Sequence, residues 1–249
     1  MTKTGFIGAR DESHVVKQQG FYPELDLGEI ASRISGVWSF NRSGSVLMDV
    51  PLANGTSGWF VSLASVDSYL RPTNVAVGKD GIGLQLCHFG DSSPYSEMWY
   101  FFDHPSATSL GLELWFATGS GGYHLSWGVE YYTGAHVRVM AVRYNETQKS
   151  LDTWTTAGWQ SFASDVQLKD SPYGANLSKL VFDLTNERLH RVYLNDKWWD
   201  LSGYSSYLGG SALGRHFTVW VQGYLDDLGF FFMTLTNLVI TTNEPLLIC

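Results

Sequence analysis

Hydrophobic and polar residues alternate along most of the chain, and helical periodicity is almost absent. Alternation with a period of two is typical of strands that bury one face. In "SLGLELWFA", 109–117, the leucines and Phe116 fall on one face, whereas Glu113 and Trp115 fall on the other. Val, Thr, Tyr, Phe and Trp are frequent in such stretches, as expected for pleated, half-buried surfaces. The pattern therefore predicts an all-β protein.

Turn-forming sequences divide the chain into about fifteen expected strands. "NGTSG" at 54–58 and "GSGG" at 119–122 are examples of these turns. The chain has no linker and no repeat of fixed period, which favours one domain, 36–249, made of two large antiparallel sheets packed face to face. The expected strands are 36–41, 45–50, 58–64, 83–89, 96–102, 109–117, 123–132, 135–144, 150–155, 158–164, 178–184, 188–194, 197–201, 216–222 and 230–241.

The stretch "FYPELDLGEI", 21–30, departs from this alternation. Its Glu24, Asp26 and Glu29 have the E-x-D-x-x-E spacing of many retaining β-glucanases. Asp26 and Glu29 also form the capping-box pattern of a helix start, and a proline beside the motif argues against a central strand. Too few residues precede the motif to build a cleft around it. We therefore predict an N-terminal extension, 1–35, with a short helix packed on the sandwich, and three carboxylates that do not converge.

Three consecutive expected strands, 109–117, 123–132 and 135–144, are separated by tight turns, so we expect them to be neighbours in one sheet. Their polar faces would then merge into one patch. A register slip of one residue would bury these charges and expose the leucines, so the patch should face solvent. It holds Glu113, Trp115, Glu130, His136 and Arg138, and the stretch "LDTWTT", 151–156, adds Asp152 and Trp154.

This combination of side chains suits a sugar. Aromatic rings stack on the C–H faces of pyranoses, and carboxylates and guanidinium groups form paired hydrogen bonds with hydroxyls. The side chains expected to bind the ligand are Trp115, His136, Arg138 and Trp154. Two carboxylates roughly 5–10 Å apart also serve as acid and base in glycoside hydrolysis, which makes Glu113 and Glu130 the candidate catalytic pair. The alternative is a structural ion pair between Glu130 and Arg138 across neighbouring strands.

Composition and charge narrow the choice of partners. Charged residues make up 16% of the 249 residues and aromatic residues 15%, with ten tryptophans. The net charge of −8 and the lack of clustered Lys and Arg argue against nucleic acid, whose phosphates require such clusters. No segment has the apolar length of a membrane helix or the pattern of a signal peptide, so we expect no membrane contact and a cytoplasmic location. In that reducing compartment Cys87 and Cys249 should both remain free thiols.

Metal ligands do not stand out in the sequence. The seven histidines show neither the H-x-H nor the H-E-x-x-H spacing of zinc sites. Two acidic stretches offer the oxygen ligands that calcium takes, although solvated turns explain them as well. These stretches hold Asp226 with Asp227, and Asp91 with Glu97. We therefore predict no cofactor and no metal site, and leave calcium open as the alternative.

The segment "LSKLVFDLTNERLHRVYLNDKWWDLSG", 177–203, contains a strand ending in "FDL", a turn, a second strand ending in "ND" and then "DLSG". It resembles consecutive antiparallel strands in concanavalin-A-like, laminin-G-like jelly rolls, and most of all an uncharacterised prokaryotic family with these motifs in the same order. The upstream "RYNETQKSLDTW", 143–154, resembles a further segment of that family. The resemblance spans 36–241 and implies a concanavalin-A-like jelly-roll sandwich. Many proteins of this fold bind or cleave carbohydrate, but the resemblance assigns no catalytic residue.

We therefore predict a carbohydrate- or glycoside-binding β-sandwich protein that uses an aromatic and acidic sheet face. One alternative is a glycoside hydrolase or lyase with Glu113 and Glu130 as its acid and base, and the sequence leaves open whether the protein is an enzyme. Another is a structural or assembly subunit, such as a homo-oligomer with its aromatic residues at interfaces. A groove lined by Glu113 and Trp115 would favour sugar, and a flat apolar face covered by a second copy would favour assembly.

Overall fold

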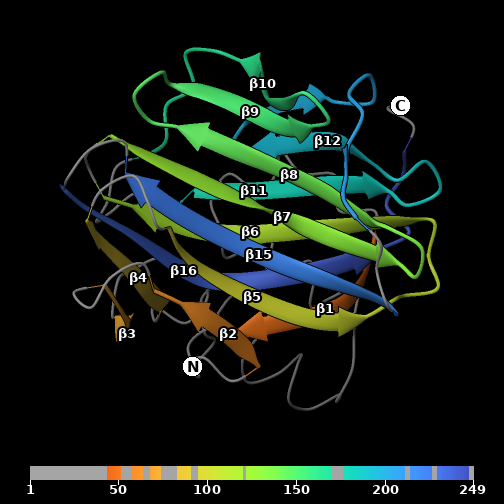
Figure 1. Cartoon of the computed structure of the whole chain (residues 1–249), viewed down its shortest axis with the longest axis horizontal. Coiled ribbons are helices and arrows are strands. Elements are labelled where there is room, and N and C mark those ends of the chain that lie inside the picture. Colours follow the sequence, from red (N-terminus) through yellow and green to blue (C-terminus); the bar gives the residue numbers. More distant parts are fainter. Residues whose placement is uncertain are drawn as a thin grey trace, which may run out of the picture.

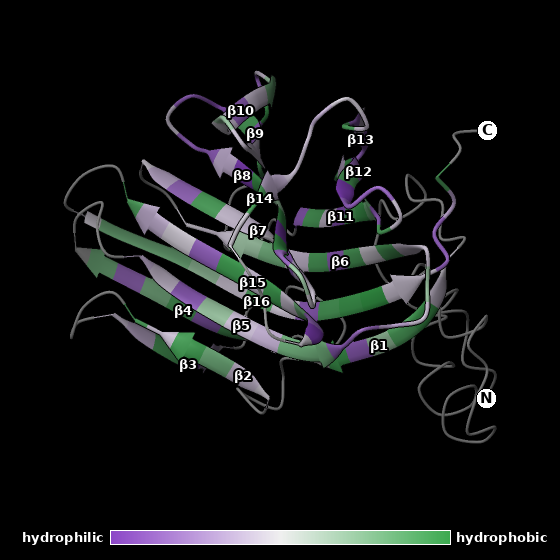
Figure 2. Ribbon diagram, turned by 45° about the vertical axis from the view of Figure 1, so that its right-hand side comes forward, coloured by the Kyte–Doolittle hydropathy of each residue, from purple (hydrophilic) through white to green (hydrophobic). Residues whose placement is uncertain are grey.

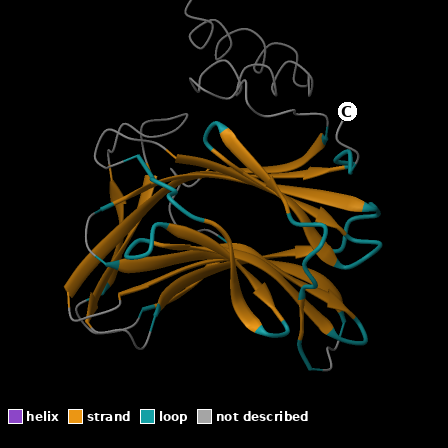
Figure 3. Ribbon diagram, turned by 90° about the horizontal axis from the view of Figure 1, so that it is seen from above, coloured by secondary structure: helices purple, strands orange, loops and turns teal. Residues whose placement is uncertain are grey.

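The computed structural model describes residues 44–51, 58–63, 68–73, 83–90, 95–119, 122–169, 176–210, 214–225 and 229–246. Within these ranges the chain forms strands, turns and loops, and no helix. Two antiparallel sheets of eight strands pack face to face (Figures 1 and 3). The all-β, two-sheet prediction is therefore confirmed. The predicted features that lie outside the described residues are the extension 1–35 with its short helix, the motif acids Glu24, Asp26 and Glu29, and the strand at 36–41.

The back sheet, which lies behind the other in Figure 1, has the strand order β13-β12-β11-β6-β16-β4-β3. The long strand β16 pairs with β6 on one side, and with β4 and then β1 on the other. The strands of the back sheet are β1 (Ser45–Pro51), β3 (Tyr69–Thr73), β4 (Gly83–Gly90), β6 (Ser109–Thr118), β11 (Asn176–Asp183), β12 (Arg188–Leu194), β13 (Lys197–Asp200) and β16 (Gly229–Thr242).

The front sheet has the strand order β10-β9-β8-β7-β15-β5-β2, and the short strand β14 also pairs with β8. Its central strands β7, β8 and β15 run across the middle of Figure 1. The strands of the front sheet are β2 (Trp59–Ser62), β5 (Ser96–Asp103), β7 (Tyr123–Thr133), β8 (Val137–Asn145), β9 (Ser150–Thr155), β10 (Gly158–Ala163), β14 (Tyr207–Leu208) and β15 (Arg215–Leu225).

The core lies between the two sheets and takes alternate side chains from most strands. Figure 2 shows hydrophobic and hydrophilic residues alternating along several of these strands. The leucines of β6 and Phe116 are in this core, as the alternation predicts. So is Trp127 of β7, whose Nε1 donates a hydrogen bond to Ser178 Oγ of β11 at 2.9 Å. Each buried large apolar side chain stabilises the fold by about 1.5–3 kcal/mol, so this core fixes how the sheets face each other.

Strand positions follow the sequence pattern closely. The predicted strands 150–155 and 188–194 coincide with β9 and β12, and the other predicted strands within the described ranges differ from the observed ones by a few residues at their ends. The sequence pattern misses β3 and β14. β3, "YLRPT", is an edge strand that contains Pro72, and proline is tolerated at sheet edges although it weakens the strand pattern. β14 has only two residues, too few to show alternation.

One predicted strand pairing is wrong. β6 lies in the back sheet between β11 and β16, whereas β7 and β8 are neighbours in the front sheet. The short connection from β6 to β7 therefore crosses between the sheets and does not form a hairpin within one of them. The polar faces of the three strands consequently cannot merge. Glu113, Trp115, Glu130 and Arg138 do not share one solvent-facing surface.

Two further predictions concern the thiols and the membrane. Cys87 on β4 is buried and is a free thiol, as predicted. Cys249 lies outside the described residues. Across the described ranges the chain offers no helix of the length and apolar character that spanning a bilayer requires.

Candidate functional site

Glu113 and Trp115 lie on the outer face of the back sheet, and only 0% and 1% of their surfaces are exposed. Trp115 packs in a small apolar cluster with Leu177. Glu113 Oε1 lies 3.2 Å from Lys179 Nζ, and Lys179 Nζ lies 2.6 Å from Glu244 Oε1. Trp115 therefore presents no ring to a ligand, and Glu113 belongs to a buried ion cluster.

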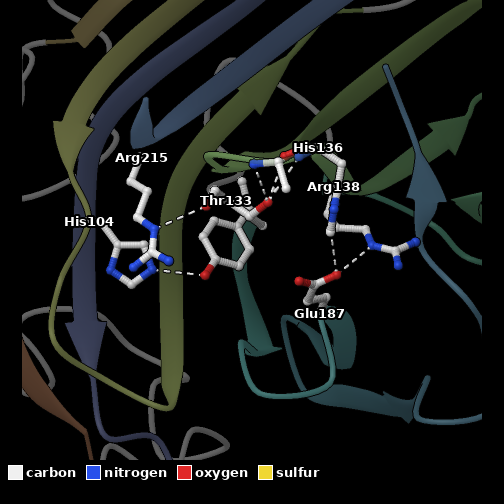
Figure 4. Close-up of polar contacts among 8 residues, drawn as sticks. His104, Thr133, His136, Arg138, Glu187 and Arg215 are labelled. Carbon is white, nitrogen blue, oxygen red and sulfur yellow. Dashed lines mark hydrogen bonds and ion pairs between the residues drawn. The ribbon is translucent and has the colours of Figure 1, made fainter. Parts of the chain in front are cut away.

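His136 and Arg138 come together, but not with the predicted partners. Arg138 leaves the front sheet on its inner side, two residues before the core residue Met140. Its Nε donates a hydrogen bond to Glu187 Oε2 at 2.8 Å, and His136 Nε2 lies 2.8 Å from the same oxygen (Figure 4). Glu130 points to the outer side of the sheet, so the alternative of a Glu130–Arg138 ion pair is wrong as well.

Glu130, Asp152 and Trp154 do share a surface, the outer face of the front sheet, which we call the aromatic face. Directly opposite residues on neighbouring strands point to the same side of a sheet, so the register defines rows across it. The central row of this face runs from β2 to β8 through Phe60, Trp99, Trp220, Gly128 and Ala141. Extending the Val142–Thr153 pairing by one residue continues the row to Trp154 on β9 and to Trp159, opposite it on β10.

Rings stand at both ends of this row and small residues lie between them. Trp99, Trp154 and Trp159 are partly exposed, and the rings of Trp154 and Trp159 pack with centroids 4.9 Å apart. A Cβ on Gly128 would come within 2.4 Å of a backbone oxygen of β8, so only glycine fits there. The small residues are buried. A ligand on this face therefore meets partly exposed rings rather than the strands beneath them.

Ionisable and amide side chains border the central row on one side. Glu97 Oε2 accepts a 3.4 Å hydrogen bond from Gln222 Nε2, across from it on β15. Farther along the same row, Arg143 donates to Asp152 Oδ2 from two nitrogens, at 3.0 and 2.6 Å. The Arg143 guanidinium also lies over the Trp159 ring, 4.7 Å from its centroid. These contacts hold Arg143 between a carboxylate and an aromatic ring.

Glu130 borders the central row on the other side. The Tyr132 hydroxyl donates a hydrogen bond to Glu130 Oε2 at 2.6 Å. Burial, and then the nearby charge of Glu130, raise the pKa of Glu97 from 4.5 to about 7. On β15, Trp220 lies two residues from Gln222 and two from Thr218. Glu97 is opposite Gln222 on one neighbouring strand and Glu130 is opposite Thr218 on the other, so the two acids lie diagonally on either side of Trp220. The site therefore combines a carboxyl group that titrates near neutrality with a second carboxylate held by a tyrosine.

Three buried polar atoms of this face have no hydrogen-bond partner among the described residues: Ser126 Oγ, Thr218 Oγ1 and Trp220 Nε1. Their residues are 0%, 2% and 8% exposed. An unpaired buried polar group costs about 1–3 kcal/mol, so three on one face are unusual. The centre of the aromatic face thus carries hydrogen-bonding capacity that the described protein groups do not use.

Sequence reasoning found Glu130, Asp152 and Trp154 of this face but missed Glu97, Trp99, Arg143 and Trp220. A signal was available, because the stretches "SEMWYFF" at 96–102 and "HFTVWVQ" at 216–222 alternate as clearly as the strands that were used. The sequence does not show that β15 pairs with β5 on one side and with β7 on the other. This pairing places these residues beside Glu130.

Metal ligation is not supported by the described part of the chain, where no group of three or more His, Cys, Asp or Glu side chains is placed to hold an ion. Glu97, one of the acids considered for calcium, lies on the aromatic face. Asp91, Asp226 and Asp227 lie outside the described residues, so the calcium alternative stays a prediction.

The chain matches no protein-family model and no curated protein sequence. Among solved structures, a carbohydrate esterase of the Shiga toxin-encoding bacteriophage phi24B matches with 8% identity and a TM-score of 0.55 over 81% of this chain and 100% of its own. The endo-β-1,4-glucuronan lyase of the fungus Trichoderma reesei gives 8% identity and a TM-score of 0.51 over 80% and 96% of the two chains.

The Emp47p carbohydrate recognition domain gives 12% identity and a TM-score of 0.50 over 82% of this chain and 100% of its own. At these identities the similarity concerns the fold. It confirms the predicted jelly-roll fold of two packed antiparallel sheets. It transfers no residue and no reaction to this chain.

Proposed function

We propose that the protein binds carbohydrate through the aromatic face of its front sheet. The observation that carries the proposal is the central row of this face, where partly exposed tryptophans stand on both sides of a strip of small residues. Indole rings stack on the C–H faces of pyranoses. Rings on both sides of the strip suit an extended saccharide that contacts them in succession.

The polar rows beside the rings suit hydroxyl groups. Glu97, Glu130 and Gln222 offer acceptors and an amide donor at half-exposed positions. Hydrogen bonds to charged groups are roughly twice as strong as neutral ones, and they give orientation to a ligand that the rings hold only by stacking. The carbohydrate esterase, glucuronan lyase and carbohydrate recognition domain that share this fold support such a ligand by analogy.

A glycan array, probed with and without calcium, would identify the ligand. Against that ligand, we expect Trp99→Ala and Trp154→Ala each to weaken binding by about 1–3 kcal/mol through lost stacking area. The matched control is Trp198→Ala, because Trp198 is 47% exposed but lies on the back sheet. Equal binding by all three variants would remove the aromatic face from the proposal.

A second candidate function is cleavage of a glycosidic bond on the same face, by a glycoside hydrolase or lyase reaction. The observation that favours it is Glu97, whose pKa of about 7 would keep it partly protonated near neutrality, as a general acid requires. Glu130, on the other side of Trp220, would be the second carboxylate. Glu97 replaces Glu113 in this pair, because Glu113 lies on the opposite side of the sandwich.

Variants at the two acids separate binding from cleavage. If the face is catalytic, Glu97→Gln and Glu130→Gln should each abolish release of reducing ends or unsaturated products from the ligand found on the array, while binding remains. Both variants remove a charge without removing volume. If neither the wild type nor the variants release product, the face only binds.

A further inference from the structure

A separate pocket opens at the edge of the sandwich, where the turn after β11 approaches the loop between β13 and β14. Its volume is about 380 Å³, within the range of about 300–1,000 Å³ typical of small-molecule sites. All of its lining residues except Gly203 carry a polar or charged side chain, among them Arg138, Asn186, Glu187, Arg188, Tyr204 and Ser205. No tryptophan of the aromatic face contributes to it.

The loop 201–206 that forms one wall crosses from the back sheet to the front sheet and is held by backbone hydrogen bonds. Leu201 N donates to His190 O at 2.8 Å, and Tyr204 N donates to Leu201 O at 2.9 Å. At the far end of the loop, Leu189 N donates to Ser206 Oγ at 3.3 Å. The wall is therefore fixed at both ends by the fold itself, so the pocket is preformed.

Glu187 holds the opposite wall in a strained conformation. Its φ of 51° lies in the left-handed region, which is unfavourable for a residue with a side chain. Such strain collects at functional sites, where surrounding contacts enforce it. Here the Glu187 carboxylate contacts Arg138 and His136, as Figure 4 shows. Burial acts to raise the pKa of Glu187, but the hydrogen bonds from Arg138 and His136 outweigh it and lower the pKa below its ordinary value.

Two guanidinium groups in the lining keep donors available. Arg138 uses Nε for Glu187, and its terminal nitrogens have no partner among the described residues. Arg188 donates from Nη1 to Ser202 O at 2.6 Å, and its Nε forms an ion pair with Asp183 Oδ2 at 3.6 Å. Each guanidinium is thus paired with one carboxylate, Arg138 with Glu187 and Arg188 with Asp183, and the nitrogens left for a ligand are the terminal ones of Arg138 and Nη2 of Arg188. Hydroxyl and amide groups from Tyr204, Asn186 and the serines surround them.

We propose that this pocket binds one carboxylate-bearing sugar residue, a hexuronate unit. The carboxylate would pair with the free nitrogens of Arg138 and Arg188, since a planar guanidinium fork matches a carboxylate. The sugar hydroxyls would meet the hydroxyl and amide groups of the lining. The proposal does not depend on the aromatic face, which lies on the outer side of the front sheet.

Gly203 is a position in the pocket lining where a bulky side chain can be introduced without a clash at its Cβ. It lines the pocket, its φ is not in the left-handed region, and a Cβ added there meets nothing within 4 Å. Gly210 has the same freedom outside the pocket lining. Gly203→Phe and Gly210→Phe are therefore a matched pair, with thermal melts to show that both fold.

The experiment titrates the full chain with glucuronate, glucose and acetate by isothermal calorimetry or ligand-observed NMR. We expect saturable glucuronate binding, with glucose and acetate each weaker by about tenfold or more, because one lacks the carboxylate and the other the hydroxyls. Gly203→Phe should lose glucuronate binding by at least about tenfold, whereas Gly210→Phe should keep it. Arg138→Lys should weaken glucuronate more than glucose, because it keeps the charge and loses the fork.

Three results would overturn the proposal: no saturable glucuronate binding by the wild type, equal affinity for glucose and glucuronate, or unchanged glucuronate binding by a folded Gly203→Phe variant. Trp99→Ala tests whether glucuronate binds to the aromatic face instead of the pocket. If Trp99→Ala abolishes glucuronate binding and Gly203→Phe does not, the sugar sits on the aromatic face and the pocket is not its site. If both proposals hold, each variant affects only its own site.

Discussion

On the outer face of the back sheet ionisable side chains are buried, whereas on the outer face of the front sheet aromatic rings are partly exposed. Glu113, Lys179 and Glu244 have 0%, 1% and 4% of their surfaces exposed. The tryptophans Trp99, Trp154 and Trp159 are only half buried. Hydrophobicity alone would predict the reverse, because charged side chains are almost never fully buried unless they are paired.

The difference arises from what lies over each sheet. Residues 243–246 fold back over the outer face of the back sheet, where Ser109 Oγ donates to Glu244 O at 2.7 Å and His190 Nε2 lies 2.6 Å from Leu246 O. This brings the Glu244 carboxylate to Lys179, which is already beside Glu113. The covering segment thus supplies the second carboxylate of the buried ion cluster, whereas Trp99, Trp154 and Trp159 of the front sheet stay partly exposed.

The largest effect on this comparison should come from Lys179→Met. Removing the one cation between Glu113 and Glu244 leaves two buried carboxylates facing each other, and breaking a buried ion pair typically costs 3–5 kcal/mol, so we expect a loss of about that size. Chemical denaturation measures it. Lys197→Met is the matched control, since Lys197 is exposed on β13, and it should change stability by less than about 0.5 kcal/mol. A loss below about 1 kcal/mol for Lys179→Met would show that the cluster is not sealed from water.

A smaller effect is expected from Arg143→Met on the aromatic face. It leaves Asp152, which is 3% exposed, without the two hydrogen bonds that it accepts from Arg143. We expect a loss of about 1–3 kcal/mol in the free energy of unfolding, less than for Lys179 because Arg143 itself reaches solvent. Arg215→Met, at an exposed position of β15, should stay near wild type. A larger loss of stability for Arg143→Met than for Lys179→Met would contradict the expected difference between the two faces.

The smallest effect is a pH dependence set by Glu97. A carboxyl group with a raised pKa in the folded protein binds its proton more tightly when folded, so its contribution to stability is full below pH 4.5 and is lost as pH rises toward about 7. Glu97→Gln should remove this slope and raise the melting temperature above pH 7, while leaving it nearly unchanged near pH 4. Melting curves between pH 4 and 8 measure it, with Asp165→Asn at an exposed turn as the control. Parallel curves for wild type and Glu97→Gln would contradict the raised pKa.

Much of the candidate site could be read from single strands. The faces assigned to Leu114, Phe116 and Glu130 are the faces they occupy, because alternation is a property of one extended strand.

What failed was the step from one strand to its neighbours. Glu113 and Glu130 were placed together because a short turn separates their strands, and short turns usually make hairpins. The turn crosses between the sheets, so the nearest strand along the chain lies in the other layer. Arg138 was misplaced for another reason: it shares its side of β8 with the core residue Met140, so it points inward, where its partner Glu187 comes from a turn of the back sheet.

The sequence by itself determined that this chain forms strands, which side chains in each strand share a face, and where most strands begin and end. These properties depend on the local pleat and on burial of one face, both of which are encoded within a few consecutive residues. Only the tertiary structure decided which strands are neighbours, and hence that Glu97, Trp99 and Trp220 join Glu130. Strand pairing depends on contacts between residues far apart in the chain, as between β5 and β15, and no local pattern contains them.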